Sequence, residues 1–351
     1  MTKQSIKGAS LFLAILLTLS SCLGMLPVQG ESRSVAADPL GAASVSLPSD
    51  DEIERAQQVL YAPASHSQKT LRVHVGGVPF GVKFMTDGVL VVGLCEIKTD
   101  HGTKNPAKEA GLRAGDVIKA VNGKRLGSAA ELTSLAEQSG GKSLTLLCVR
   151  DGKEITVSLT PARSVEEGRY KTGLYVRDSG AGIGTVTFIM PKTCAFAGLG
   201  HGICDAGTGA LIPMERGAVV DVTVSGVVKG LPGAPGEIKG FFKSGKTGTL
   251  LGNTECGVYG VFANLPEGVS RQTVPIGGRN ELKEGKAYLV CTLEGGTRRQ
   301  YEIEISSIRR DSTTNKCFHV KVTDPALLSQ TGGIVQGMGV CYNRDNTVKL
   351  E

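Results

Sequence analysis

The stretch that decides the fold is Pro106-Ala-Lys-Glu-Ala-Gly-Leu-Arg-Ala-Gly-Asp-Val-Ile-Lys-Ala-Val-Asn-Gly123. Its first part, Pro106–Leu112, predicts one short helix. Its second part, Asp116–Asn122, predicts a strand that ends at the turn dipeptide Asn122-Gly123. The regular pattern extends in both directions from this helix and strand.

On both flanks the apolar residues recur with the period of strands or of an amphipathic helix. The pair Asp151-Gly152, which lies between the last two apolar runs, is a strong hairpin signal. The predicted elements are strands at Leu71–Val75 and Gly88–Leu94, a helix at Ser128–Gln138, and strands at Ser143–Arg150 and Glu154–Leu159 around the turn Asp151-Gly152.

This order of strands and two helices is similar to a PDZ domain, and the 106–123 stretch resembles the signature of bacterial PDZ modules. The resemblance implies that an extended peptide adds as a strand beside the second PDZ strand. The loop Pro79–Phe84 would then hold the peptide's terminal carboxylate. Gly81 would give the tight turn, and Phe80 and Val82 would donate backbone N–H groups. The alternative is a PDZ domain that serves packing only and has an empty groove.

Beyond Pro161 the sequence becomes rich in glycine and in short strand-like runs, with no long helical pattern. The predicted strands indicate an all-β domain, for which a barrel is the natural way to remove sheet edges. They lie at Gly184–Ile189, Ala218–Val228, Thr247–Leu251, Val258–Ala263, Lys286–Leu293, Arg299–Ile305 and Cys317–Thr323.

Five histidines limit the candidates for acid–base chemistry. His201 differs from the others because glycines flank it in Gly198-Leu-Gly-His-Gly202, so that backbone or substrate can approach the imidazole closely. A histidine in a turn with no chemical role is the competing interpretation. Metal binding is not expected, because no Cys/His cluster has ligand spacing.

A series of motifs in this second region resembles the stage IV sporulation protein B family of serine peptidases. The motifs, in order, are Asp178-Ser-Gly-Ala-Gly-Ile-Gly-Thr-Val-Thr-Phe188, Gly198-Leu-Gly-His-Gly202, Asn253–Phe262, Asp324-Pro-Ala-Leu-Leu328 and Thr331-Gly-Gly-Ile-Val-Gln-Gly-Met338. The resemblance implies a mainly β protein in which a PDZ domain precedes a chymotrypsin-like double β-barrel. It assigns His201 as the general base and Asp324 as the residue that orients it. High-temperature-requirement proteases fit less well, because there the protease precedes the PDZ domain.

The chain departs from the family directly after Met338. Family members continue with Ser-Gly-Ser-Pro, whose first serine is the nucleophile, whereas Gly339 occupies that position here. Glycine has no side chain that can attack a carbonyl. A frameshift or truncation of the gene and a genuine pseudopeptidase are the two explanations. On either one, we expect the chain as written to be inactive, and a non-catalytic PDZ adaptor is the alternative function.

The resemblance also implies a function and partners. Family members act between the mother cell and forespore membranes, where they cleave themselves and a membrane-associated regulator and so trigger processing of a late sigma factor. The expected partners are therefore a peptide or protein substrate, most specifically that sporulation regulator, and the chain itself. No cofactor is implied.

The N-terminus predicts export. Lys3 and Lys7 precede an apolar run, which is typical of a signal peptide or short membrane anchor. Leu19-Ser-Ser-Cys22 also resembles a lipobox, so lipidation of Cys22 is an alternative tether. The predicted domains are this segment at 1–30, a linker at 31–69 with a short helix near Asp51–Leu60, a PDZ domain at 70–162 and a peptidase domain at 165–351 that is incomplete after about residue 338.

Composition supports a folded globular protein. Of 351 residues 40% are hydrophobic, which excludes bulk disorder, and the 48 glycines show no Gly-X-Y period, which excludes collagen. The net charge of +6 is spread along the chain without a basic run, so nucleic-acid binding is not expected. Nine cysteines lack any CxxC pair, and several lie in apolar runs, which favours buried free thiols over disulfides.

Overall fold

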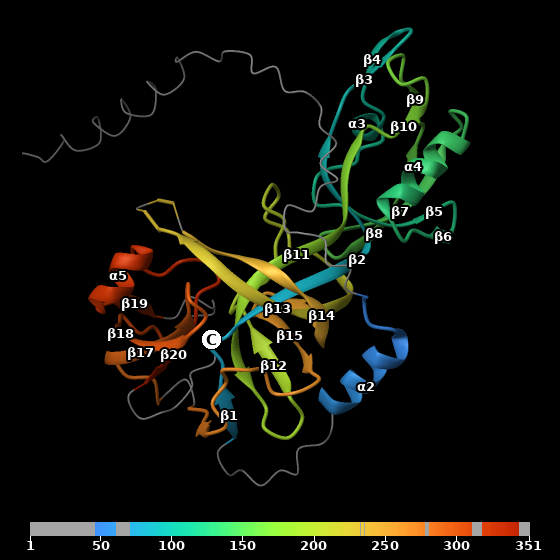
Figure 1. Cartoon of the computed structure of the whole chain (residues 1–351). Coiled ribbons are helices and arrows are strands. Elements are labelled where there is room, and N and C mark those ends of the chain that lie inside the picture. Colours follow the sequence, from blue (N-terminus) through green and yellow to red (C-terminus); the bar gives the residue numbers. More distant parts are fainter. Residues whose placement is uncertain are drawn as a thin grey trace, which may run out of the picture. The chain divides into compact units, whose positions relative to one another are not determined.

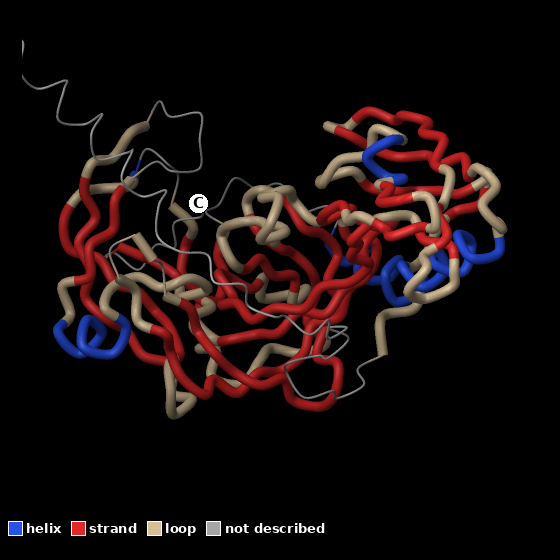
Figure 2. The backbone as a smooth tube through the Cα atoms, turned by 90° about the horizontal axis from the view of Figure 1, so that it is seen from above, coloured by secondary structure: helices blue, strands red, loops and turns tan. Residues whose placement is uncertain are grey.

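The computed structural model describes residues 46–60, 71–231, 233–234, 236–277, 281–310 and 318–343. It is 52% strand and 11% helix, which confirms the mainly β prediction (Figure 2). The predicted signal segment with Cys22 and most of the linker lie outside the described residues. Within the described part, none of the helices has the length and apolar character needed to cross a membrane.

The elements carry the labels of Figure 1. In chain order they are α2 (Asp50–Leu60), β1 (Arg72–Val75), β2 (Pro79–Leu94), β3 (Ile97–Thr99), β4 (Gly102–Lys104), α3 (Pro106–Glu109), β5 (Val117–Val121), β6 (Lys124–Arg125), α4 (Ala129–Gln138), β7 (Leu144–Arg150), β8 (Lys153–Leu159), β9 (Ala162–Arg163), β10 (Tyr170–Lys171), β11 (Leu174–Ile189), β12 (Ala195–Gly198), β13 (Met214–Val228), β14 (Glu237–Thr254), β15 (Gly257–Phe262), β16 (Thr273–Pro275), β17 (Gly285–Thr292), β18 (Arg298–Ser306), β19 (His319–Val322), α5 (Pro325–Thr331) and β20 (Val340–Asn343).

From Gly88 to Leu159 the PDZ-like part follows the sequence prediction closely, whereas the strand predicted at Leu71–Val75 pairs as β1 with the end of β11 and with β16 and not with the PDZ strands. Strand β5 pairs with both β2 and β7, and β7 forms the predicted hairpin with β8. Asp151 and Gly152 both have positive φ angles, of 50° and 73°, as a two-residue type I′ turn requires. Ser128 is the N-cap of helix α4, and its side chain accepts a hydrogen bond from the Glu131 backbone N–H. Leu132 and Ala136 of α4 are buried in the core of this part.

Six strands of the second part close into a ring. Strand β2 pairs with β11, β11 with β12, and β12 with β15. From β15 the pairing continues to β14, then to β13, and from β13 back to β2. A closed ring leaves no strand edge open along it, as expected for a barrel. The other sheet runs β19-β18-β17-β20 among the described residues, and its closure into a second barrel stays a prediction.

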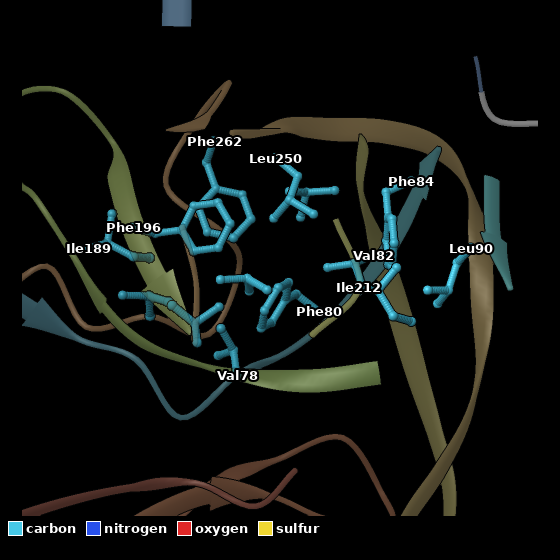
Figure 3. Close-up of a cluster of buried hydrophobic side chains, with 14 of the residues drawn as sticks. Val78, Phe80, Val82, Phe84, Leu90, Ile189, Phe196, Ile212, Leu250 and Phe262 are labelled. Atoms are coloured by element: carbon cyan, nitrogen blue, oxygen red, sulfur yellow. The ribbon is translucent and has the colours of Figure 1, made fainter. Parts of the chain in front are cut away.

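Aromatic and branched side chains fill the inside of this ring (Figure 3). The ring of Phe80 meets that of Phe196 edge to face, with centroids 5.4 Å apart, and Phe196 lies 4.4 Å from Phe262. Such pairs add to the stabilisation that burial of the rings provides. Phe80 comes from the first half of β2, so residues that precede the PDZ part complete the core of the second part.

The predicted short helix of the linker is present as α2, and it is attached to the ring. Glu52 forms an ion pair with Lys246 of β14, and Asp50 lies 3.4 Å from Arg216 of β13. The hydrogen bond from Lys246 lowers the pKa of the Glu52 carboxyl to about 2. Glu52 is therefore charged throughout the neutral pH range, and this end of the linker is attached to the folded part.

The cysteines agree with the expectation of free thiols. The six cysteines whose side chains are described are all unpaired, and Cys148 and Cys291 are fully buried. Burial raises the pKa of the Cys148 thiol to about 11 and that of Cys291 to about 12. Cys204 and Cys256 are exposed. The prediction of buried thiols therefore holds for two of these residues and fails for two others.

Iodoacetamide at pH 8 is expected to modify Cys204 and Cys256 in the native protein and to spare Cys148 and Cys291. A pKa raised from 9.0 to about 11 lowers the reactive thiolate of Cys148 about 100-fold, before burial restricts access. Peptide mass spectrometry after timed quenching measures the rates, and a sample in urea provides the unprotected reference. Native modification of Cys148 at the rate of Cys256 would contradict the expected burial.

Candidate active site

Thr185 of β11 joins two segments that carry predicted site residues. Its backbone oxygen accepts a hydrogen bond from the Leu199 N–H at 3.1 Å, two residues before His201. Its hydroxyl donates to the Gly337 oxygen at 2.6 Å, two residues before Gly339. Thr185 is only 4% exposed, so both bonds are shielded from water. The His201 segment and the Gly339 segment are thus both hydrogen-bonded to one buried residue.

The segment that leads to His201 has an unusual backbone. Leu199 and Gly200 have φ angles of 77° and 72°, a region that leucine seldom adopts. A side chain at Gly202 would come within 2.6 Å of the Thr254 oxygen, and one at Gly257 within 2.4 Å of the Gly198 oxygen. Gly202 is therefore required because the turn 254–257 packs directly against this segment, whereas Gly200 is favoured by its positive φ angle alone.

Asn253 holds the chain that follows His201 through three hydrogen bonds. Its Oδ1 accepts a hydrogen bond from the Ile203 N–H at 2.8 Å, and its Nδ2 donates to the oxygens of Ile203 and Ile212 at 2.8 and 2.9 Å. One side chain thus fixes both ends of the loop 203–212. In the sequence, Asn253 is only the first residue of the motif Asn253–Phe262, and nothing there predicts that it holds this loop.

The imidazole of His201 is exposed, and its Nδ1 lies 3.0 Å from the Gly202 oxygen. A carbonyl oxygen only accepts, so Nδ1 carries the hydrogen in this contact. In the neutral ring Nε2 then keeps a free lone pair. This is the tautomer that a general base needs, although a backbone carbonyl orients the ring here rather than a carboxylate.

Asp324 lies at the start of α5 and acts as its N-cap. Its Oδ1 accepts hydrogen bonds from the N–H groups of Ala326 at 2.9 Å and Leu327 at 3.1 Å. Both bonds satisfy N–H groups that have no partner inside the helix. Among the hydrogen bonds and ion pairs of the described residues, none joins Asp324 to His201. The assignment of Asp324 as the orienting residue stays a prediction.

The segment that ends at Gly339 has three anchors. The Thr331 oxygen accepts from the Gly230 N–H at 2.9 Å, and the Gln336 N–H donates to the Gly236 oxygen at 2.8 Å. The third anchor is the bond between Thr185 and Gly337 described above. These bonds place α5 and the following residues beside the ends of β13 and β14, and they fix the path of the chain into Gly339, the position predicted for the nucleophile.

Gly339 itself has no room for a side chain. Its φ angle is 63°, and an added Cβ would lie 2.7 Å from both the Val290 oxygen and the Leu289 Cδ1. The following strand β20 pairs with β17 in a register that matches Val340 with Val290. A residue other than glycine at position 339 would require β17 or β20 to move.

Asp205 supports the loop after His201 and was also missed by sequence reasoning. It is 3% exposed, and its Oδ1 accepts hydrogen bonds from the N–H groups of Gly207 and Thr208 at 3.1 and 3.0 Å. Its Oδ2 lies 3.3 Å from the Arg177 Nη1. The only sequence signal was Asp205-Ala-Gly-Thr208, a typical turn in which the aspartate binds N–H groups further along the chain.

The predicted peptide-carboxylate loop is wrong. Phe80, Gly81 and Val82 lie within β2, where β11 pairs with all three and β13 pairs with Gly81 and Val82 on the other edge. Phe80 and Val82 are each 2% exposed, and a side chain at Gly81 would come within 2.6 Å of the Phe242 ring. Gly81 is therefore required for close packing and not for a turn. The N–H groups of this stretch belong to the sheet, so they are not free to hold a carboxylate.

No three His, Cys, Asp or Glu side chains gather into a possible metal site in the part of the chain that the structure describes. The polar groups that the structure places in this region include the His201 imidazole, the nearby backbone groups and the Thr185 hydroxyl. An acid–base function at His201 is compatible with this set, whereas nucleophilic attack needs a group that Gly339 does not supply.

Two family models match the chain. The model described as SpoIVB peptidase S55 matches residues 168–342, and that of the PDZ domain matches residues 102–150. The first match contains all the residues that converge on Thr185. The second contains the stretch from which the fold prediction began.

Similar curated proteins share shorter stretches with the chain. A candidate zinc metalloprotease of Mesorhizobium japonicum is 28% identical over 162 residues, which cover 40% of this chain and 43% of that protein. The regulator of sigma-W protease RasP of Bacillus subtilis is 31% identical over 77 residues, 22% of this chain and 18% of that protein. The chain thus spans less than half the length of either relative.

A PDZ domain from an SdrC-like protein of Listeria monocytogenes is similar among solved structures. It is 22% identical, with a TM-score of 0.21, and the match covers 26% of this chain and 87% of that one. The identification of the chain rests on the two family matches and not on this structural similarity. The chain is a SpoIVB-like, PDZ-containing member of the SpoIVB peptidase S55 family.

Proposed function

We propose that this protein has the framework of a sporulation-signalling serine endopeptidase, in which His201 is the general base, and that the chain as written does not catalyse peptide hydrolysis. The family match supports the peptidase framework. The observation that carries the proposal is the convergence of the His201 and Gly339 segments on Thr185, because a nucleophile at position 339 would then arise close to the base.

The proposed absence of catalysis rests on Gly339. Attack on a peptide carbonyl needs a hydroxyl or thiol at the nucleophile position, and glycine supplies neither. The lack of space at this position adds a second obstacle. Even Gly339→Ser is expected to stay inactive, because its Cβ would lie 2.7 Å from a backbone oxygen of β17.

The finer parts of the proposal follow the family. The substrates would be a membrane-associated sporulation regulator and the chain itself, with self-cleavage in the 31–69 linker, and Asp324 would assist His201 in an active relative. The protein would be exported and membrane-tethered, through a signal anchor or through Cys22, and would act between the mother cell and forespore membranes. Within the linker, α2 is helical and attached to the ring by Glu52, so cleavage is expected outside Asp50–Leu60.

The test is labelling with a serine-directed fluorophosphonate probe, run beside hydrolysis of a casein substrate. We expect no label on the purified 351-residue chain or on its Gly339→Ser variant, while an active serine peptidase in the same reaction labels fully. Label that forms on the native chain and disappears after heat denaturation would refute the proposed lack of catalysis. Mass spectrometry of the labelled peptide would identify the nucleophile.

A non-catalytic PDZ adaptor is the second candidate, and Gly339 favours it. Under that function the chain would bind C-terminal peptides without cleaving them. The position of Phe80, Gly81 and Val82 inside the ring argues against binding through the expected carboxylate loop. Absence of label together with saturable binding of peptides that end in a free carboxylate would favour the adaptor.

A further inference from the structure

The strands β13 and β14 continue past the ring as a two-stranded arm, residues 221–243 (Figure 1). Strand β13 pairs with β2 only as far as Val220, and β14 pairs with β15 only from Gly248 onward. Between these limits the two strands pair with each other, as far as Val228 opposite Glu237. The arm is therefore not held by the ring along its length, and the packing of its two faces differs.

One face of the arm is covered and the other is exposed. On the covered face, Val227 and Ile238 pack against the core of the second sheet, and Phe242 is buried. On the other face, Val228 is 41% exposed and Phe241 is 58% exposed. Because neighbouring residues of a strand point to opposite faces, this outer face keeps a phenylalanine in contact with water beside the one that is buried.

The tip of the arm, residues 229–236, presents a further apolar side chain. Leu231 is 69% exposed, the largest value among the exposed large hydrophobic residues that the structure describes. Two backbone hydrogen bonds between Leu231 and Ala234, each 2.9 Å long, close a tight turn that fixes this position. The stretch Gly230-Leu-Pro-Gly-Ala-Pro-Gly236 contains no charged residue. The tip is thus an apolar, uncharged turn at the end of the arm.

Three lysines border these apolar side chains. Lys239 and Lys243 lie two residues before and two residues after the exposed phenylalanine, and Lys229 directly precedes the tip; all three are exposed. Lys239 approaches Glu237 at 3.9 Å, yet 61% of its side chain stays exposed, and the other carboxylate of this face is Asp221. Neither Lys229 nor Lys243 forms an ion pair within the described residues. Exposed lysines beside apolar side chains can hold their ammonium groups in a lipid headgroup layer while their neighbours insert.

We propose that the outer face and the tip of the arm bind the surface of an anionic lipid bilayer. Val228, Leu231 and Phe241 insert into the boundary between headgroups and acyl chains, and the three lysines contact the anionic headgroups. Apolar side chains flanked by basic ones are the pattern with which an amphipathic element lies in that boundary. A projecting turn fits a fluid surface, which adapts to its shape.

The expected membrane segment at residues 1–30 favours this occupant. Residues 31–49 separate it from α2, which begins at Asp50 and is attached to the ring through Glu52. Nineteen residues span at most about 65 Å when fully extended. A tethered chain would therefore keep the arm close to the bilayer and raise its effective concentration there. The proposal uses the proposed tether for this proximity alone.

The experiment uses tryptophan as a reporter, because the chain contains none and an introduced one is seen without background. Leu231→Trp and Phe241→Trp are the two reporters on the arm. Tyr175→Trp is the matched control, at a side chain of β11 that is 61% exposed. The full chain is reconstituted into vesicles of phosphatidylcholine, with or without phosphatidylglycerol. Emission spectra and quenching by lipids with brominated acyl chains measure insertion.

We expect the emission of both arm reporters to shift to shorter wavelength in vesicles that contain phosphatidylglycerol. Brominated chains should quench both, because insertion to a depth of about 5–10 Å brings the indole to the acyl boundary. Tyr175→Trp should keep the emission of an exposed indole. In the Leu231→Trp background, Lys243→Gln should lower the ratio of inserted to free arm about fivefold, whereas Lys153→Gln on β8 should leave it unchanged.

Two results would overturn the proposal. One is quenching of both arm reporters no stronger than that of Tyr175→Trp. The other is a wavelength shift that grows with protein concentration in the absence of vesicles, because it would assign the arm to a second copy of the chain. Flotation of the vesicles reads the tether separately: a chain that floats with both reporters unquenched refutes the arm contact and leaves the proposed tether standing. Two reporters at separate sites, each checked by circular dichroism, keep the test decisive if one substitution disturbs the fold.

Discussion

Arg150→Ala is expected to destabilise the protein by about 3–5 kcal/mol, the cost of removing one partner of a buried ion pair. Asp116 is 1% exposed, and Arg150 binds both of its oxygens at 2.7 Å. The same guanidinium donates to the Gly111 oxygen at 2.7 Å. The substitution therefore leaves a buried carboxylate with one remaining protein donor, the Arg113 N–H. Urea unfolding followed by far-ultraviolet circular dichroism measures the change, because the chain contains no tryptophan.

Lys98→Ala is the control for this loss. Lys98 and Glu166 form an ion pair at 2.9 Å, but their side chains are 71% and 62% exposed, so the pair should contribute 0 to about 1 kcal/mol. The double variant Arg150→Met with Asp116→Leu should regain much of the loss, because it leaves no unpaired buried charge. An Arg150→Ala loss as small as that of Lys98→Ala would show that water reaches Asp116.

The PDZ part could be predicted from the sequence because its signals are local. The helix at Pro106, the strand that follows and the Asp151-Gly152 hairpin depend on residues within a few positions of one another, and the structure confirms each. Helix α4 likewise shows its buried face directly in the sequence. Such a pattern predicts the same helix or strand in any fold that buries the same face of the element.

The longest strands could not be predicted, since their partners lie far away in the sequence. The sequence predicts a ligand loop at Pro79–Phe84, yet this stretch is a buried strand between β11 and β13. The stretch 178–184 is rich in glycine, which weakens strand signals, although β11 runs through it. Only tertiary pairing shows that residues before the PDZ part complete the ring and that residues after it complete the PDZ sheet.

This exchange of strands explains why the predicted carboxylate loop is wrong, whereas the role of His201 stays a prediction. The carboxylate loop required the first half of β2 to end in a free turn, but β11 continues beyond its PDZ pairing and forms hydrogen bonds with it. His201 depends on short contacts with Thr185 and with the turn 254–257. The role predicted for Asp324 depends on a contact between distant segments; in the structure its carboxylate caps α5, and the role stays a prediction.

Gly76→Ala is expected to destabilise the protein by about 3 kcal/mol or more, the upper range for overpacking a buried site. An added Cβ would lie 1.9 Å from the Val186 oxygen and 2.5 Å from the Val186 carbon, which are backbone atoms of β11 and cannot rotate away. Gly76 also donates its N–H to the Thr187 oxygen at 3.0 Å and accepts from the Arg298 Nε at 2.7 Å. Any shift that relieves the clash therefore weakens the contacts of β1 with both β11 and β18.

Gly226→Ala provides the matched control, and its effect should have the opposite sign. Gly226 lies in β13 with no atom within 4 Å of an added Cβ, and its φ angle is not in the left-handed region. Alanine there should stabilise the protein by about 0.4–1 kcal/mol, because it reduces the conformational entropy of the unfolded chain. Both free energies follow from the same urea titration. Equal effects of the two substitutions would contradict the close approach of Gly76 to β11, and with it the path of β1 beside the strand that carries Thr185.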